Sequence, residues 1–196
     1  MAALDTSNAN PVRGPLSNQA GADAVNQMKG IFDQWKGSPD FFQSAGDYFS
    51  TRNASTAAIL MVAEMEAQLD DNLQSFVYEV NGIPVGVMLV QVKDDCVYVD
   101  AIVTNPLQSG CGGALIEAAV RYSHAQGKAG TVKLLAAGDD ACAAYFRMGF
   151  LRDDGGTEAA AGPMTLNSGT SAAWAASTDG PALAAHAGKR YVTGFG

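Results

Sequence analysis

The residues with the clearest chemical potential form a glycine-rich stretch from Gln108 to Gly113, which reads QSGCGG. A β-branched run, residues 97–103, precedes it, and an amphipathic run that ends at Gly127 follows it. A strand, a glycine-rich turn and a helix start together form an anion site, because glycines let the backbone approach a phosphate and free N–H groups favour negative charge. The spacing matches neither the GxGxxG nor the Walker motif, so a tight turn in an ordinary α/β protein is the alternative.

Covalent and metal chemistry receive less support from the sequence. Cys111 and Cys142 could act as nucleophiles, but no histidine neighbours either of them. The three cysteines form no CxxC pair and are too scattered for a disulfide framework, which fits a reducing compartment. His124 and His186 cannot form a metal site by themselves. We therefore expect no bound metal.

These residues depend on predicted strands and helices that position them. Asn81-Gly82 between two apolar runs is the strongest short-range signal of a β-hairpin. Apolar residues at helical spacing indicate a first helix that ends before Gly37. The expected helices are 22–36, 54–69, 114 to about 127 and 139–147, and the expected strands are 75–80, 83–92, 97–103, 131–136, one that begins at Phe150, and 163–167.

The two ends of the chain differ from its middle in composition. Residues 1–20 are rich in Ser, Asn, Ala and Pro without apolar periodicity, which predicts a disordered leader. Residues 168–196 are rich in Ala, Gly, Ser and Thr, and could form short helices or stay loose, with Trp174 and Tyr191 as anchors. The sequence thus predicts one domain over 21–167 with a C-terminal extension.

Composition excludes some classes of function. The chain has 196 residues, 47% of them hydrophobic, which is enough for a sizeable core in one domain. Its net charge of −8 argues against nucleic-acid binding, which relies on cationic side chains. The acidity would attract cationic substrates such as amines, or simply keep the protein soluble. No apolar run of membrane-spanning length and no signal peptide is recognisable, so we expect a soluble, cytoplasmic protein without a membrane partner.

The order of elements and two motifs resemble the GNAT superfamily of acetyl-CoA-dependent N-acyltransferases. The order is a hairpin, a strand, the QxGxGG turn, a helix, a strand, and a helix with AxxxY that ends in GF. The most specific parts are residues 108–116 and 141–150, and the resemblance extends over roughly residues 22–166. It implies an α/β (α+β) fold with a central mixed, twisted sheet and helices on both faces, and acetyl-CoA as the acyl donor.

The resemblance also assigns roles to individual residues. Tyr145 matches the family tyrosine that donates to the leaving sulfur of coenzyme A, a role that suits a hydroxyl with a pKa near 10. The pantetheine arm would bond to the main chain of the central strand, and the turn would hold the pyrophosphate. The matching cofactor-binding residues are Ile102 and Val103 on the strand and Gln108, Ser109, Gly110, Cys111, Gly112 and Gly113 in the turn.

This chain departs from the family pattern at two positions. Counted back from Gly110 and Gly112, the family Arg or Gln falls on Leu107, so Gln108 is the replacement on a loop one residue shorter. The family often has Asn where Gly138 stands here. Both departures weaken the expected hold on the cofactor.

The general base is less determined. Asp100 lies on the central strand three residues before Val103, where its carboxylate could face the acceptor amine, or it could face solvent or pair with a lysine. Glu64, Glu66 and Glu79 are the fallback candidates.

Three functions remain open at this point. The first is direct acetyl transfer to a primary amine, on a small molecule or a peptide, within a ternary complex. The second is a non-catalytic coenzyme A-binding module of the same fold, and the third is an exported bacterial effector acetyltransferase, suggested by the leader and the extension. The aromatic segment 41–49 would pack in the core or line the acceptor site, and the extension could pack across a homodimer.

Overall fold

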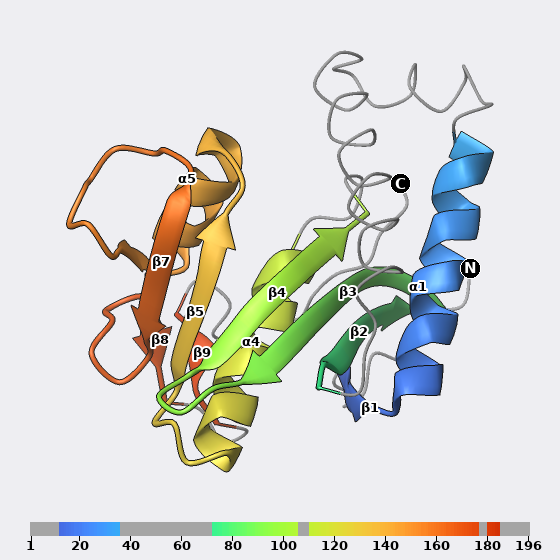
Figure 1. Ribbon diagram of the computed structural model, residues 1–196, viewed down its shortest axis with the longest axis horizontal. Coiled ribbons are helices and arrows are strands. Elements are labelled where there is room, and N and C mark those ends of the chain that lie inside the picture. Colours follow the sequence, from blue (N-terminus) through green and yellow to red (C-terminus); the bar gives the residue numbers. More distant parts are fainter. Residues whose placement is uncertain (1–11, 36–71, 106–109, 177–179, 185–196) are drawn as a thin grey trace, which may run out of the picture.

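The computed structural model describes residues 12–35, 72–105, 110–176 and 180–184. Their strands form a seven-stranded sheet in the order β1-β2-β3-β4-β5-β7-β6 and a separate two-stranded sheet, β8-β9 (Figure 1). Neighbours in the large sheet are antiparallel except β4 and β5, which run parallel. The elements are β1 Val12–Leu16, α1 Asn18–Trp35, β2 Gln74–Val80, β3 Ile83–Val92, β4 Val97–Thr104, α4 Cys111–Ala125, β5 Thr131–Ala136, α5 Asp139–Arg147, β6 Leu151–Arg152, β7 Gly162–Asn167, β8 Trp174–Ala175 and β9 Ala182–Leu183.

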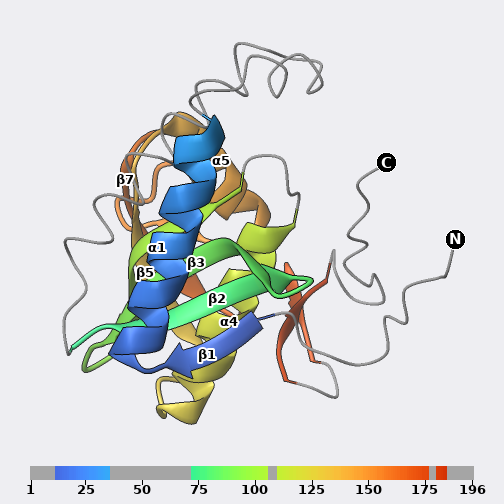
Figure 2. The same cartoon turned by 90° about the vertical axis from the view of Figure 1, so that its right-hand side faces the viewer.

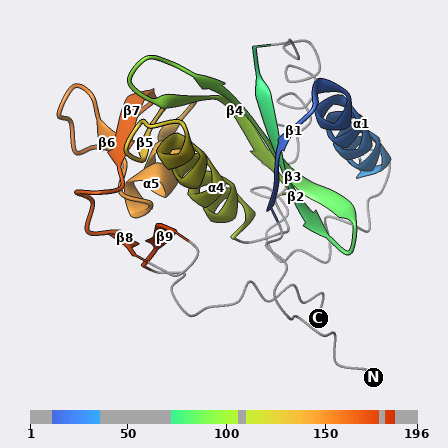
Figure 3. The same ribbon diagram turned by 90° about the horizontal axis from the view of Figure 1, so that it is seen from below.

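Helices cover both faces of the large sheet (Figure 3). α1 lies on one face, where Val25 and Met28 are buried against β2, β3 and β4. α4 and α5 lie on the other face, over a larger core that includes Leu115, Ile116 and Cys142. The predicted mixed sheet with helices on both faces is therefore confirmed.

The predicted hairpin at Asn81-Gly82 is also present. Both residues have positive φ angles, 53° and 76°, as a two-residue turn that follows the right-handed twist of its strands requires. The turn joins β2 to β3, which pair from Gln74 with Val90 to Val80 with Ile83. β3 thereby becomes a central strand, buried over most of its length.

The prediction of a disordered leader over residues 1–20 is wrong for its last part. Residues 12–16 form β1, which pairs antiparallel with β2 and buries Val12. α1 then begins at Asn18, four residues before the predicted start, and the Ser17 hydroxyl accepts a hydrogen bond from the Ala20 N–H at 3.3 Å. A serine before the helix is an N-cap signal, whereas the pairing of β1 with a strand some sixty residues away leaves no local trace.

The described part of the C-terminal extension forms strands instead of the short helices considered above. β8 and β9 pair through Trp174 with Leu183 and Ala175 with Ala182. Trp174 is buried, as expected of an anchor. The predicted helix over 54–69, the aromatic segment 41–49 and Tyr191 lie outside the described residues.

Candidate active site

β4 separates from β5 halfway along its length. The two strands pair only at Val97 with Val132, Tyr98 with Lys133 and Val99 with Leu134, and they diverge beyond that point (Figure 1). From residue 101 to 104, β4 keeps its pairing with β3 and has no β5 partner among the described strands. The β5-facing backbone edge of this half of β4 is therefore open to other hydrogen-bonding groups.

A β-bulge lies where the separation begins. Leu89 of β3 pairs with Ala101, but the next residue, Val90, pairs with Val99, so Asp100 is the extra residue of β4. A bulge increases the local twist and bends the strand that carries it. This bend accounts for the divergence of β4 from β5.

The bulge also changes which face of the sheet each β4 residue occupies. Before it, Val97 and Val99 pack in the core under α4; after it, Ala101 and Val103 pack in the core under α1. Ile102, half-buried, therefore faces the α4 side, and the Val103 side chain faces away from it. Tyr98 lies before the bulge between Val97 and Val99, so by alternation it lies on the face opposite α4. Burial raises the pKa of the Tyr98 hydroxyl, and the charge of the exposed Asp100 adds to this rise, which places Asp100 on the same face as Tyr98.

The glycine-rich turn leads directly into α4. Gly110 has a left-handed φ of 86°, and the helix begins at Cys111, three residues before the expected start. Gly112 and Gly113 thus belong to the first turn, whose N–H groups have no acceptor within the helix, and no side-chain cap is present. A Cβ built on Gly112 would have no described atom within 4 Å. Gln108 and Ser109, together with Leu107, lie outside the described residues.

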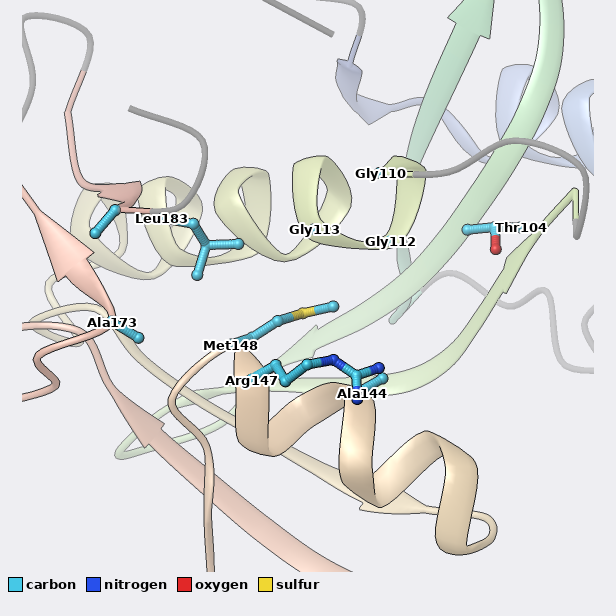
Figure 4. Close-up of a pocket in the computed structure, with 10 residues that line it drawn as sticks. Thr104, Gly110, Gly112, Gly113, Ala144, Arg147, Met148, Ala173 and Leu183 are labelled. Carbon is cyan, nitrogen blue, oxygen red and sulfur yellow. The ribbon is translucent and has the colours of Figure 1, made fainter. Parts of the chain in front are cut away.

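A pocket of about 360 Å³ lies between the end of β4, the start of α4, the end of α5 and the C-terminal extension (Figure 4). The side chains of Arg147 and Met148 extend from the end of α5 toward the first turn of α4 (Figure 4). Arg147 forms no ion pair with any residue of the described ranges. The lining consists of Thr104 from β4, Gly110, Gly112 and Gly113 from the α4 start, Ala144, Arg147 and Met148 from α5, and Ala173, Leu183 and Ala184 from the extension.

The sequence reasoning missed Arg147 as a pocket residue. The only available signal was its place two residues after Tyr145, and a basic residue in the last turn of a helix is common for other reasons. In the folded chain, its guanidinium and the N–H groups of the α4 start face one pocket. Together they form an electropositive surface that suits a phosphate group.

Tyr145 lies on α5 beside this pocket but is not one of its lining residues. Its ring packs against the main core, with its centroid 5.4 Å from that of Phe150. Burial raises the pKa of the Tyr145 hydroxyl to about 12, so the side chain remains a hydrogen-bond donor at neutral pH.

Cys111 stands at the first position of α4, where a helix start ordinarily favours a thiolate. Here the side chain is buried, and desolvation instead raises the pKa of the Cys111 thiol to about 11. Cys142 is buried as well. Within the described ranges, no group of histidine, cysteine and carboxylate side chains could hold a metal ion. Because both side chains are buried, the thiols of Cys111 and Cys142 belong to the core.

The fold and the pocket define an α+β protein with a glycine-rich helix start beside a central strand that separates from its neighbour. Residues 39–150, more than half of the chain, match the model of the acetyltransferase (GNAT) family. The chain belongs to this family. No curated protein matches it, and no helix in the described ranges is long and apolar enough to cross a membrane.

Solved structures of the same family are similar to the chain at low identity. The PaiA N-acetyltransferase of Thermoplasma acidophilum, solved with coenzyme A, is 13% identical with a TM-score of 0.48, over 80% of this chain and 97% of that chain. A GCN5-related N-acetyltransferase of Rhodopseudomonas palustris is 20% identical with a TM-score of 0.48, over 80% and 94%. The ribosomal-protein-S18-alanine N-acetyltransferase of Escherichia coli is 24% identical with a TM-score of 0.42, over 54% and 75%.

Proposed function

We propose that this protein is an N-acetyltransferase that moves the acetyl group of acetyl-CoA directly to a primary amine within a ternary complex. One observation carries the proposal: β4 separates from β5 between the pocket on the α4 face and Asp100 on the opposite face. Donor and acceptor would approach from opposite faces of the sheet and meet where the strands part. Such positioning turns a reaction between two molecules into an effectively unimolecular step.

The residues of the pocket fit the donor. Gly112 and Gly113 offer backbone N–H groups at a helix start, and Arg147 offers a guanidinium that pairs with no carboxylate of the described ranges, both suited to a diphosphate. A Cβ at Gly112 would meet no atom of the described residues within 4 Å, so glycine keeps that approach clear. The open edge of β4 at Ile102 and Val103 offers main-chain groups to the amides of the pantetheine arm. Acetyl-CoA supplies the activated thioester.

Tyr145 would stabilise the departing sulfur. Its pKa of about 12 lies well above that of an ordinary thiol, near 8.5, so the proton stays on the tyrosine. The hydroxyl therefore acts by donating a hydrogen bond to the thiolate, not by transferring its proton completely. Small movements of α5 would be needed, since Tyr145 is not itself a pocket-lining residue.

Asp100 would receive the proton that the amine loses, directly or through a water molecule. It is exposed at the bulge, where a cationic small molecule or peptide can reach it. The net charge of −8 assists the approach of such an acceptor. The buried, protonated Cys111 favours direct transfer over an acyl-enzyme.

Calorimetric titration with acetyl-CoA and a thiol-release assay over a panel of amines test this function. The Asp100→Asn variant should bind acetyl-CoA like the wild type and lose about a hundredfold in turnover, the usual contribution of a general base. Absence of acetyl-CoA binding, or of thiol release with every amine, would refute the proposed function. Equal turnover by the variant would refute the role of Asp100 as the base.

A non-catalytic coenzyme A-binding module is the second candidate. The position of Tyr145 against the core, outside the pocket lining, favours it. It predicts tight binding of coenzyme A without thiol release from any amine, which the same two assays distinguish.

A further inference from the structure

The C-terminal hairpin, formed by β8 and β9, is fixed to both helices that flank the pocket. From β8, the Trp174 Nε1–H donates to the backbone oxygen of Met148, at the end of α5, over 2.8 Å. From β9, the Leu183 N–H donates to Glu117 Oε1 of α4 over 2.9 Å. Figure 3 shows the hairpin beside the two helices.

The anchor at Glu117 is buried, and the anchor at Trp174 is partly buried. Trp174 and Leu183 belong to the main core, and Glu117 is only 6% exposed although it carries a carboxylate. A hydrogen bond to a buried charged group is among the stronger ones in proteins, and leaving such a group unsatisfied is costly. A further bond, from the Ala184 N–H to the Ala173 oxygen at 2.7 Å, joins the two ends of the hairpin. The hairpin is thus held across the pocket as a fixed wall.

The pocket has two chemically different ends. Thr104, Gly112 and Arg147 make one end polar and electropositive. Leu183 and Ala173 make the other end apolar, and Met148 lies between the two (Figure 4). The lining therefore suits a ligand that joins an anionic group to one that can pack against apolar side chains.

We infer that the C-terminal hairpin forms the wall against which the nucleotide end of coenzyme A packs; this rests on the proposed function. The pantetheine arm leaves the diphosphate toward the open edge of β4, so the nucleotide must leave on the other side, where the hairpin stands. A volume of about 360 Å³ lies at the lower limit for whole ligands. It suits one portion of the cofactor, a purine base and its phosphates.

The C-terminal extension would complete the cofactor site. The family match ends at residue 150, whereas Ala173, Leu183 and Ala184 lie beyond it. The extension is therefore a specificity element for the cofactor and not a separate appendage. Because the extension would contact the nucleotide, coenzyme A should bind more tightly than its pantetheine arm alone.

Matched substitutions on the hairpin test this assignment. Ala184→Glu places a carboxylate on the hairpin wall of the pocket, where the nucleotide would pack, and Ala175→Glu places the same charge on β8 outside the pocket lining. Both alanines are exposed, so neither change disturbs the core. The affinities for coenzyme A and for 4′-phosphopantetheine, which lacks the nucleotide, are measured by calorimetry for the full-length wild type and both variants, and thermal unfolding checks the fold.

The ratio of the two affinities reports the contribution of the nucleotide. We expect coenzyme A to bind the wild type at least tenfold more tightly than 4′-phosphopantetheine, the ratio to fall at least fivefold in Ala184→Glu, and Ala175→Glu to keep the wild-type ratio. A wild-type ratio near one, an unchanged ratio in Ala184→Glu, or an equal fall in both variants would overturn the inference while the proposed function stands. Failure of the wild type to bind coenzyme A at all would instead refute the proposed function, and this inference with it.

Discussion

Replacing Gly112 with alanine should make the protein more stable and its hold on acetyl-CoA weaker. Gly112 lies in the first turn of α4, and a Cβ there would have no described atom within 4 Å, so the side chain costs no packing. Alanine is more favourable than glycine in a helix, because glycine loses more backbone freedom on folding. The same methyl group would stand where a phosphate must approach the backbone.

The expected changes in Tm and in the dissociation constant for acetyl-CoA follow from these contacts. The helical preference is worth about 0.5–1 kcal/mol, which corresponds to an increase in Tm of about 1–4 °C for a chain of this length. Loss of one hydrogen bond between a backbone N–H and a charged phosphate costs roughly 1.5–3 kcal/mol. The dissociation constant for acetyl-CoA should therefore rise between about tenfold and a hundredfold.

Gly30→Ala is the matched control for this experiment. Gly30 lies within α1, on the other face of the sheet, and its Cβ would also meet no described atom within 4 Å. It should raise Tm by a similar amount without any effect on binding, as measured by thermal unfolding and calorimetry. Wild-type affinity in Gly112→Ala would refute the assignment of the phosphates to the α4 start. A lower Tm in that variant would refute the packing argument.

Three further predictions concern the neighbouring side chains. Arg147→Gln should weaken acetyl-CoA binding about tenfold in calorimetry without lowering Tm, because the exposed guanidinium acts through its charge; unchanged affinity would remove it from the site. Tyr145→Phe should lower turnover at least tenfold in a thiol-release assay and leave the affinity for coenzyme A within twofold. Since burial raises the pKa of Tyr145 to about 12, ionisation of this hydroxyl should not reduce the wild-type rate below about pH 10. A loss of rate below about pH 10 that is absent from the Phe variant would contradict the raised pKa. Cys111→Ala should retain turnover. In the folded wild type at neutral pH, mass spectrometry should find no alkylation of Cys111 by iodoacetamide, because the thiol is buried and its pKa is raised to about 11. Rapid alkylation would contradict this expectation.

The sequence by itself determined the elements whose causes are local. The Asn81-Gly82 hairpin follows from turn chemistry, and the structure has it at the predicted residues. β5 and α5 begin and end where the alternating and helical patterns predict. The order of these elements with the glycine-rich turn and the AxxxY motif was enough to predict the fold and the family, because that order constrains the topology strongly.

Tertiary pairing decided the details on which the site depends. The bulge at Asp100 exists because β3 and β4 change register, and one extra residue reverses which face every later side chain of β4 occupies. The sequence of β4 alone contains no signal for this change. The place of Asp100 on the face opposite the pocket could therefore not be predicted.

The wall of the pocket was hidden from the sequence for the same reason. The bond between Glu117 and Leu183 joins residues 66 positions apart, and the composition around Leu183 resembles a loose tail. Arg147 reads as an ordinary helix-terminal base until α5 is packed beside the start of α4. Local patterns determine which segments fold, whereas the contacts that make them a site arise only when distant segments are brought together.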